Sequence, residues 1–277
     1  MISIKNIPIS HPDAPSLVGV VLSAAKIILQ IYSENFTTEY KEDREPVTIA
    51  DKRSDEQIIK ELQQYFPSDK ILTEEHGLVI PSTKESNRLW IVDPIDGTKE
   101  FINRTGEFSI QVALAINESL SLGAVYQPTS STLYLASENE GCWQYSSESD
   151  WKRLYVSKSF TPNLTLAVSK NHPCSLGQRI HKLLGGTNQI SRGGVGLKLM
   201  AIAKNEANYY INNSNKTKAW DSAAPEILFK EAGGIITDLK GNSFSYAPKD
   251  YRHKNGLVAS CSNELHEKVL KLAQIYS

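Results

Sequence analysis

Hydrophobic residues recur at helical spacing in two stretches near the start of the chain. Residues 17–29 are apolar around most of a helical turn, and their few polar members fall on one stripe. Residues 55–66 place Ile58 and Leu62 one turn apart, and Pro67 ends that pattern. Both patterns predict helices with a buried face. The first stretch is shorter than a bilayer-spanning helix and contains a charge, so we expect no transmembrane segment.

Shorter apolar runs bounded by turn residues predict β-strands along the rest of the chain. We expect strands at residues 71–73, 89–92, 109–116, 122–127, 132–136, 164–168, 207–211, 234–238 and 257–260. Further helical patterns lie at residues 175–184, 196–204, 222–231 and 263–275.

The most polar connection, residues 146–162, divides the chain into two predicted lobes. Residues 1–155 combine helices with a run of neighbouring strands, which predicts an α+β lobe. Residues 156–277 alternate strand and helix, which is typical of an α/β lobe. We expect a layered fold in which both lobes share one cleft.

Composition and charge narrow the function classes. The chain has 277 residues, of which 40% are hydrophobic and 22% charged, as in ordinary globular proteins. Its 30 Lys and Arg against 31 Asp and Glu leave a formal net charge of −1. Polymeric nucleic acid is bound through an excess of cations, so this balance argues against such a partner and leaves room for a small anionic ligand held by a local cluster of charges. The three cysteines are widely spaced without a Cys-x-x-Cys pair, so we expect free thiols and a cytoplasmic location.

Two aspartates follow an apolar strand closely in residues 90–98, Trp-Ile-Val-Asp-Pro-Ile-Asp-Gly-Thr. Pro94 cannot continue the hydrogen-bond ladder, so Asp93 and Asp96 are expected to converge at the strand end, beside the carbonyl of Ile95. Two carboxylates this close repel each other unless a cation lies between them. Oxygen ligands alone favour a hard ion such as Mg²⁺ over zinc.

The same segment predicts a helix start. Thr98 is a good N-cap residue, and the backbone N–H groups of Gly97 and Thr98 would point outward there, as in phosphate-binding turns. The alternative is a plain Asp-Gly turn followed by a capped helix. This segment alone does not decide between the two.

Three further acidic residues stand at the ends of predicted elements. Glu74 ends a short apolar strand. Asp51 precedes the helix at residues 55–66, and Asp221 opens a helix in which Pro225 falls in the first turn, where proline is tolerated. Asp51 and Asp221 would each be an ordinary helix cap in isolation. Acidic positions at so many element ends, beside one phosphate-type turn, favour a single shared site.

Three motifs together resemble the Mg²⁺-dependent, lithium-sensitive phosphatases of the inositol monophosphatase superfamily. They are Thr-Glu-Glu (73–75), Asp-Pro-Ile-Asp-Gly-Thr (93–98) and Trp-Asp-Ser-Ala-Ala (220–224), in the order and spacing of that family. Lys-Glu-Phe (99–101) is similar to its 3′(2′),5′-bisphosphate nucleotidase branch of CysQ type, whereas inositol monophosphatases more often carry Thr-Asn-Phe. The resemblance covers essentially the whole chain and implies the sugar-phosphatase fold, with alternating αβαβα layers.

The resemblance also implies a metal-binding role for the acidic positions. The ligands of a first ion would be Glu74, Asp93, the Ile95 carbonyl and Asp96. Asp96 and Asp221 would hold a second ion, with Asp93 bridging. The expected cofactor is Mg²⁺, as two or three ions. The lobe at residues 1–155 would carry most of the metal ligands, and the lobe at residues 156–277 would complete the metal and substrate site.

Catalysis and phosphate binding are assigned by the same resemblance. Asp51 is similar to the acid that, paired with Thr98, activates the attacking water, so Asp51, Thr98 and Glu74 are the expected catalytic positions. Gly97 and Thr98 would hold the scissile phosphate through backbone N–H groups, and Asp221 would also contact the substrate.

A polar segment after the strand at residues 164–168 resembles the part of the nucleotidase branch that reaches the nucleoside and its second phosphate. This segment, Ala-Val-Ser-Lys-Asn-His (167–172), follows the pattern of that branch's Ser-Arg-Ser-His run. It would place Ser169 and His172 at the substrate, with Lys170 adding positive charge. The alternative is an ordinary surface turn.

Two more segments would complete the nucleotide side of the cleft. Gly194 and Lys198 match the branch's Gly-x-x-x-Lys element, although residues 195–196 are Val-Gly where many bacterial members have two serines. We therefore expect backbone contacts there. Either Lys216 or Lys218 would meet the 5′-phosphate in place of the arginine of the family.

We therefore expect a phosphomonoesterase that removes the 3′-phosphate of adenosine 3′,5′-bisphosphate, giving AMP and phosphate, in sulfur assimilation or recycling. The first alternative is an inositol monophosphatase or broader sugar phosphatase. The second is a binding protein that kept the fold without activity, which the intact acidic positions disfavour. The resemblance implies a monomer or a homodimer, and the sequence does not decide between them. Peripheral attachment to the inner membrane enters through the resemblance alone, since the sequence shows no anchor.

Overall fold

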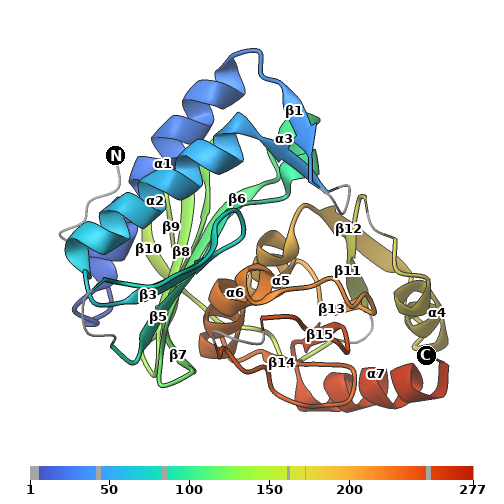
Figure 1. Ribbon diagram of the computed structural model, residues 1–277. Coiled ribbons are helices and arrows are strands. Elements are labelled where there is room, and N and C mark those ends of the chain that lie inside the picture. Colours follow the sequence, from blue (N-terminus) through green and yellow to red (C-terminus); the bar gives the residue numbers. More distant parts are fainter. Residues whose placement is uncertain are drawn as a thin grey trace.

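Helices and sheets alternate in five layers (Figure 1). The computed structural model describes residues 6–41, 45–82, 86–160, 163–171, 173–247 and 251–276. Helices α1 and α2 cover one face of an eight-stranded sheet, and α5 and α6 lie between that sheet and a five-stranded one. Helices α4 and α7 cover the outer face of the second sheet. This order confirms the αβαβα arrangement expected from the sequence.

The helices agree with the sequence patterns in number and place, but several begin earlier. They are α1 (Ala14–Ser33), α2 (Ile49–Tyr65), α3 (Thr98–Ile102), α4 (Ser175–Leu183), α5 (Val195–Ala203), α6 (Ala219–Glu231) and α7 (Asn263–Tyr276), with a short 3₁₀ turn at Pro128–Ser130. Within the described ranges one helix, α1, is long and apolar enough to cross a membrane by length and composition. Its buried residues pack against α2 and the eight-stranded sheet, as in the core helix of a globular protein.

The eight-stranded sheet has the order β10-β9-β8-β7-β6-β5-β3-β4. Its strands are β3 (Lys70–Thr73), β4 (Gly77–Val79), β5 (Arg88–Asp96), β6 (Ser109–Ile116), β7 (Ser119–Gln127), β8 (Thr132–Ser137), β9 (Gly141–Ser146) and β10 (Ser149–Leu154). From β5 to β10 each strand is antiparallel to its predecessor, whereas β3 and β5 are parallel. A separate hairpin joins β1 (Thr38–Tyr40) to β2 (Pro46–Thr48).

The polar connection predicted at residues 146–162 was partly wrong, because β10 occupies its first half. Strand β10 is the edge of the sheet and most of its residues are exposed, so it lacks the alternating apolar residues that mark a half-buried strand. The division of the chain at residues 155 and 156 stays a prediction.

The five-stranded sheet has the order β12-β11-β13-β15-β14. Its strands are β11 (Thr165–Ser169), β12 (Asn188–Arg192), β13 (Tyr209–Asn212), β14 (Ile235–Thr237) and β15 (Leu257–Ser260). Strand β11 is parallel to both of its neighbours, and β15 is antiparallel to both of its own. The apolar residues between the two sheets form one core, which contains Ile91 and Val125 from the first sheet and Leu228 from α6.

Candidate active site

A kink in β5 brings two aspartates to one side of the sheet. Successive side chains of a regular strand point to opposite faces, so residues three positions apart should point apart. The pairing of β5 with β6 shifts by one residue between Asp93 and Asp96, which is a β-bulge. Because of this extra residue, the side chains of Asp93 and Asp96 point to the same face of the sheet. Pro94 lies in the bulge, where its missing N–H costs no ladder bond. The sequence pattern predicted that this strand ends before Pro94. In the structure, β5 continues to Asp96.

Gly97 and Thr98 begin the short helix α3. Gly97 has φ 101°, a left-handed conformation that favours glycine, and it is the N-cap. The prediction of Thr98 as the N-cap was wrong, because Thr98 is the first residue inside the helix. Its hydroxyl donates to Oδ1 of Asp51 at 3.1 Å and also lies 3.2 Å from the carbonyl oxygen of Ile95. The hydroxyl is thus directed at the acidic site, away from the helix backbone.

Asp51 lies in the first turn of α2, which begins six residues earlier than the apolar pattern indicated. Its Oδ2 accepts the backbone N–H of Thr48 at 2.7 Å and the Thr48 hydroxyl at 2.6 Å, completing a capping box. Its Oδ1 accepts Thr98. Burial raises the pKa of Asp51 to about 7, even though the hydrogen bonds from Thr48 act in the opposite direction. The structure therefore makes Asp51 both a helix cap and the partner of Thr98.

Asp221 occupies the corresponding place at the start of α6. Its Oδ2 accepts the backbone N–H of Lys218 at 2.6 Å. Pro225 was expected in the first turn, but α6 begins at Ala219 and contains Pro225 in its interior. The early start follows from the capping interaction of Asp221, which apolar periodicity does not detect.

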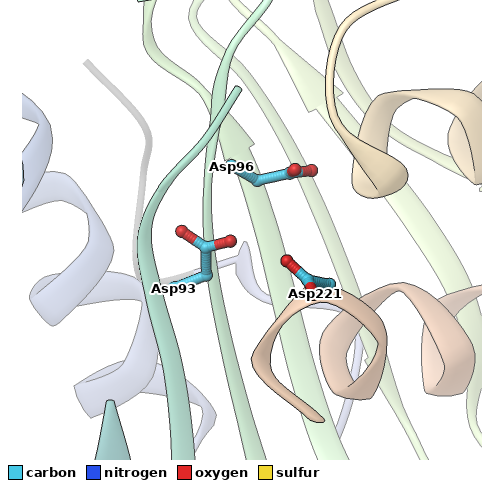
Figure 2. A group of neighbouring side chains, drawn as sticks. All are labelled: Asp93, Asp96 and Asp221. Carbon is cyan, nitrogen blue, oxygen red and sulfur yellow. The ribbon is translucent and has the colours of Figure 1, made fainter. Parts of the chain in front are cut away.

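The carboxylates of Asp93, Asp96 and Asp221 surround one small space (Figure 2). One oxygen of each lies within 4.8 Å of the other two, with Asp93 and Asp96 supplied by β5 and Asp221 by α6. Burial raises the pKa values of Asp93 and Asp221 well above the usual range, and the charge of Glu74 raises both further. Three carboxylates this close, two of them buried, are strongly unfavourable without a cation. The site therefore fits a hard cation held by oxygen ligands alone.

Glu74 follows β3 and lines the same cleft. Its Oε1 lies 2.9 Å from Nζ of Lys41, which also lies 2.6 Å from Oε1 of Glu75. Burial raises the pKa of Glu74, and the Lys41 ammonium offsets only part of that shift. The sequence interpretation missed Lys41, because a contact between residues so far apart leaves no local pattern.

The start of α5 holds Asp96 from the opposite side. The N–H of Val195 donates to Oδ1 of Asp96 at 3.1 Å, and the N–H of Gly196 donates to Oδ2 at 2.8 Å. Burial raises the pKa of Asp96 to about 6, while the Lys198 ammonium and these N–H groups act to lower it. A Cβ at Gly194 would lie 2.0 Å from Oδ2 of Asp96, so a side chain at that position would displace the carboxylate.

Lys198 is buried beside this contact. Its Nζ donates to the carbonyl oxygen of Gly193 at 3.2 Å and lies 5.3 Å from the ring centre of Tyr210. Burial lowers its pKa, and the charge of Asp96 opposes that shift. Lys198 therefore supplies a buried positive charge next to the acidic cluster.

A cleft of about 770 Å³ connects the acidic cluster to the second sheet. The predicted site residues that line it are Glu74, Asp93, Ile95, Asp96, Gly97, Thr98, Ser169, Gly194, Lys198 and Asp221. Asp51 is buried behind Thr98. His172 lies outside the described residues. The cleft is also lined by amide side chains from the second sheet and the segments next to it, which are Asn171, Gln178, Asn212 and Asn213.

The three lysines that were candidates for binding an anionic group lie in different surroundings. Lys216 is exposed and lines the cleft. Lys218 instead lies 3.4 Å from Oε2 of Glu45 and close to the Trp220 ring. Lys170 does not point to a free anion position, because its Nζ lies 3.0 Å from Oε2 of Glu107.

Comparison with known proteins agrees with this geometry. The chain matches the inositol monophosphatase family over residues 12–277 and belongs to that family. It is 30% identical over 230 residues to the 3′(2′),5′-bisphosphate nucleotidase CysQ of Salmonella typhimurium, covering 82% of this chain and 91% of that protein. The chain is therefore a phosphatase of this family.

Two further proteins are also similar to this chain, one in sequence and one in solved structure. The fructose-1,6-bisphosphatase/inositol-1-monophosphatase of Thermotoga maritima is 28% identical over 227 residues, with 82% of this chain and 81% of that protein covered. The crystal structure of CysQ from Bacteroides thetaiotaomicron has a TM-score of 0.72 at 25% identity, with 90% of this chain and 96% of that chain covered.

Proposed function

We propose that this phosphatase hydrolyses the 3′-phosphate of adenosine 3′,5′-bisphosphate, giving AMP and phosphate, in sulfur assimilation or recycling. The observation that carries the proposal is the lining of the cleft. Besides the acidic cluster, the cleft is lined by amide side chains from the second sheet and its neighbouring segments, which suits a base and a second phosphate. The name of the Salmonella typhimurium relative supports the same substrate.

We assign the proton-transfer role to Thr98 and Asp51. The Thr98 hydroxyl donates to Asp51, so its oxygen is free to accept a hydrogen bond from the attacking water. The ionised Asp51 can then take up the proton through Thr98, and its raised pKa suits that task near neutral pH. The backbone N–H groups of Gly97 and Thr98 are assigned to the scissile phosphate.

Asp93, Asp96, Asp221, Glu74 and the Ile95 carbonyl are assigned to two or three Mg²⁺ ions. When bound, such ions lower the pKa of water and stabilise charge on the phosphoryl oxygens and leaving group. The described ligands are all oxygen atoms, which supports Mg²⁺ over a softer metal.

Lys216 is assigned to the 5′-phosphate, because Lys218 is paired with Glu45 while Lys216 lines the cleft. Ser169 is assigned to the nucleoside because it also lines the cleft. A monomer or homodimer and a cytoplasmic location also belong to the proposal. The location is supported by the three free cysteines.

The test is phosphate release with Mg²⁺ from adenosine 3′,5′-bisphosphate and from inositol 1-phosphate, with Asp96→Asn as the blank and a LiCl arm. We expect the nucleotide to be preferred and lithium to inhibit. Lys216→Ala should raise KM for the nucleotide, whereas Lys152→Ala, an exposed lysine on β10, should not. A preference for inositol 1-phosphate would favour the second candidate, an inositol or sugar phosphatase like the Thermotoga maritima relative.

A further inference from the structure

Two polar contacts connect a loop of the first sheet to a loop of the second. Nδ2 of Asn171 donates to Oε1 of Glu100 at 2.8 Å, and Nζ of Lys170 lies 3.0 Å from Oε2 of Glu107. Glu100 belongs to α3, and Asn171 follows β11. We call these two contacts the loop clamp. Neither contact takes part in the phosphatase chemistry proposed above.

The helix that carries Glu100 is anchored in the first core by its neighbour Phe101. The next residue, Phe101, is fully buried, and its ring lies 4.9 to 5.1 Å from the rings of Tyr32, Phe36 and Phe108. This aromatic contact fixes α3 on the first core and directs Glu100 toward the second sheet.

Two glycines enclose the Glu100 side chain. A Cβ at Gly97 would lie 3.3 Å from Oε2 of Glu100, and a Cβ at Gly193 would lie 3.1 Å from its Cγ. Only 5% of Glu100 is exposed. Its carboxylate therefore has little freedom, and a hydrogen bond to a charged acceptor is stronger than one between neutral groups.

The loop that Glu100 holds forms one wall of the cleft. Glu100, Ser169, Asn171 and Cys174 all line it. A small phosphomonoester needs only the acidic cluster and the α3 turn, whereas a nucleotide extends to this wall. The position of the wall should therefore affect the two kinds of substrate differently.

We propose that Glu100 is a positioning residue that selects nucleotide substrates by holding Asn171, and with it the loop after β11, at the cleft. This inference rests on the proposed function. It also gives a physical reason for the Lys-Glu-Phe sequence at residues 99–101, in which Phe101 anchors α3 and Glu100 holds the opposite wall.

The kinetic test compares Glu100→Ala, Asn171→Ala and the double variant on adenosine 3′,5′-bisphosphate and on p-nitrophenyl phosphate. Each single variant should lower the ratio of kcat/KM for the nucleotide to that for p-nitrophenyl phosphate about tenfold, mainly through KM. The double variant should lose no more than either single variant, because both remove the same contact. Glu100→Gln keeps an acceptor for Asn171 and should restore most of the ratio.

Asn255→Ala is the matched control. Its Nδ2 donates to Oδ2 of Asp238 at 3.0 Å, which is the same type of contact away from the cleft. It should leave the substrate ratio within twofold of the wild type. A similar fall in Asn255→Ala, or an unchanged ratio in Glu100→Ala, would overturn the proposal.

A second readout is independent of the substrate. Trypsin cleavage after Lys170, followed by mass spectrometry, should be at least fivefold faster in Glu100→Ala and Asn171→Ala than in the wild type or in Glu100→Gln. Equal cleavage rates would show that Glu100 does not hold the loop. If the wild-type chain releases no phosphate from the nucleotide, the proposed function fails, and the cleavage rates alone decide whether the loop clamp exists.

Discussion

The two carboxylate oxygens of Asp51 have separate partners. Oδ2 accepts two hydrogen bonds from Thr48 at the start of α2, and Oδ1 accepts one from Thr98 of α3. The helix cap therefore fixes the orientation of the oxygen that faces the active site. A helix-capping role for Asp51 is therefore compatible with the catalytic role proposed for it, because the two roles use different oxygens.

Removing the Thr98 hydroxyl should slow the chemical step more than it weakens binding. In Thr98→Val, we expect kcat to fall by about 10²-fold, since a positioned proton-transfer group contributes about 10² to 10⁴. KM should change by less than about threefold, because the backbone N–H groups assigned to the phosphate remain. Steady-state kinetics measures both values. Thr98→Ser keeps the hydroxyl and should retain most of kcat, and equal losses in both variants would argue against a hydroxyl role.

At the scale of elements, the sequence pattern located the helices but misplaced their starts. Helices α2 and α6 begin before their apolar periodicity does, because their first turns carry capping carboxylates. Asp51 and Asp221 are those residues, and their side chains accept backbone N–H groups. Sequence reasoning placed both residues at helix starts, where the structure has them, whereas their role in a shared site stays a prediction.

Two glycines should respond oppositely to alanine. Gly19 lies inside α1 with nothing within 4 Å of an added Cβ, so Gly19→Ala should stabilise the protein by about 0.5–1 kcal/mol through helix propensity. At Gly123 of β7, an added Cβ would lie 2.4 Å from Cγ2 of Ile227 on α6, so Gly123→Ala should destabilise by about 1–3 kcal/mol. Urea unfolding measures both. The same sign for both variants would contradict this packing.

The contact between α7 and β14 should make stability depend on pH. His266 is buried, and its Nε2 lies 2.9 Å from the Thr237 hydroxyl. Burial lowers the pKa of His266 from 6.5 to about 4, so the unfolded chain binds the proton more readily. Stability present above pH 6.5 is therefore lost as the pH falls toward 4, by no more than about 1.4 kcal/mol per pH unit.

His266→Gln tests this dependence, since glutamine can keep the bond to Thr237 without titrating. Unfolding measured between pH 7 and pH 4 should show a weaker decline in the variant than in the wild type. Parallel curves would assign the decline to other groups.

At the scale of the molecule, the acidic cluster should link stability to the metal binding proposed above. Asp93 and Asp96 come from β5 and Asp221 from α6, so the cluster forms only when α6 packs on the first sheet. The raised pKa values of Asp93 and Asp221 reflect burial first, and then repulsion from neighbouring carboxylates, of which Glu74 contributes most. The metal-free protein is therefore destabilised by its own site.

Asp93→Asn should raise the melting temperature of the chelator-treated protein by several degrees while abolishing most of its activity. For the wild type, Mg²⁺ at a hundred times its Kd should add about 2.7 kcal/mol to the free energy of unfolding, and the variant should gain much less. Calorimetry with EDTA and with Mg²⁺ measures both effects. Asp69→Asn is the contrasting control, because Asp69 is paired with Arg88 and accepts the Trp90 indole N–H, so its neutralisation should destabilise. A lower melting temperature for metal-free Asp93→Asn would refute the account.

The layered architecture could be predicted from the sequence because strands and helices alternate in the second half of the chain. Hydrophobic residues recur at a different spacing in helices and in strands, so each kind of element can be recognised. Contacts between distant residues were not accessible in that way. Lys41 with Glu74, and Glu100 with Asn171, are brought together by the packing of whole elements. Strand β10 was missed because an exposed edge strand needs no apolar alternation.

The core between the two sheets also has a consequence for synthesis of the chain. Ile91 and Val125 are covered on that face by α6, which follows β10 along the sequence. At about 5–20 residues per second, the roughly 80 residues from the end of β10 to the end of α6 take about 4–15 s to emerge from the ribosome. During that time the apolar residues that α6 covers in the folded protein lack this cover. We therefore expect a nascent chain stalled in this interval to bind chaperones more readily than the completed protein does.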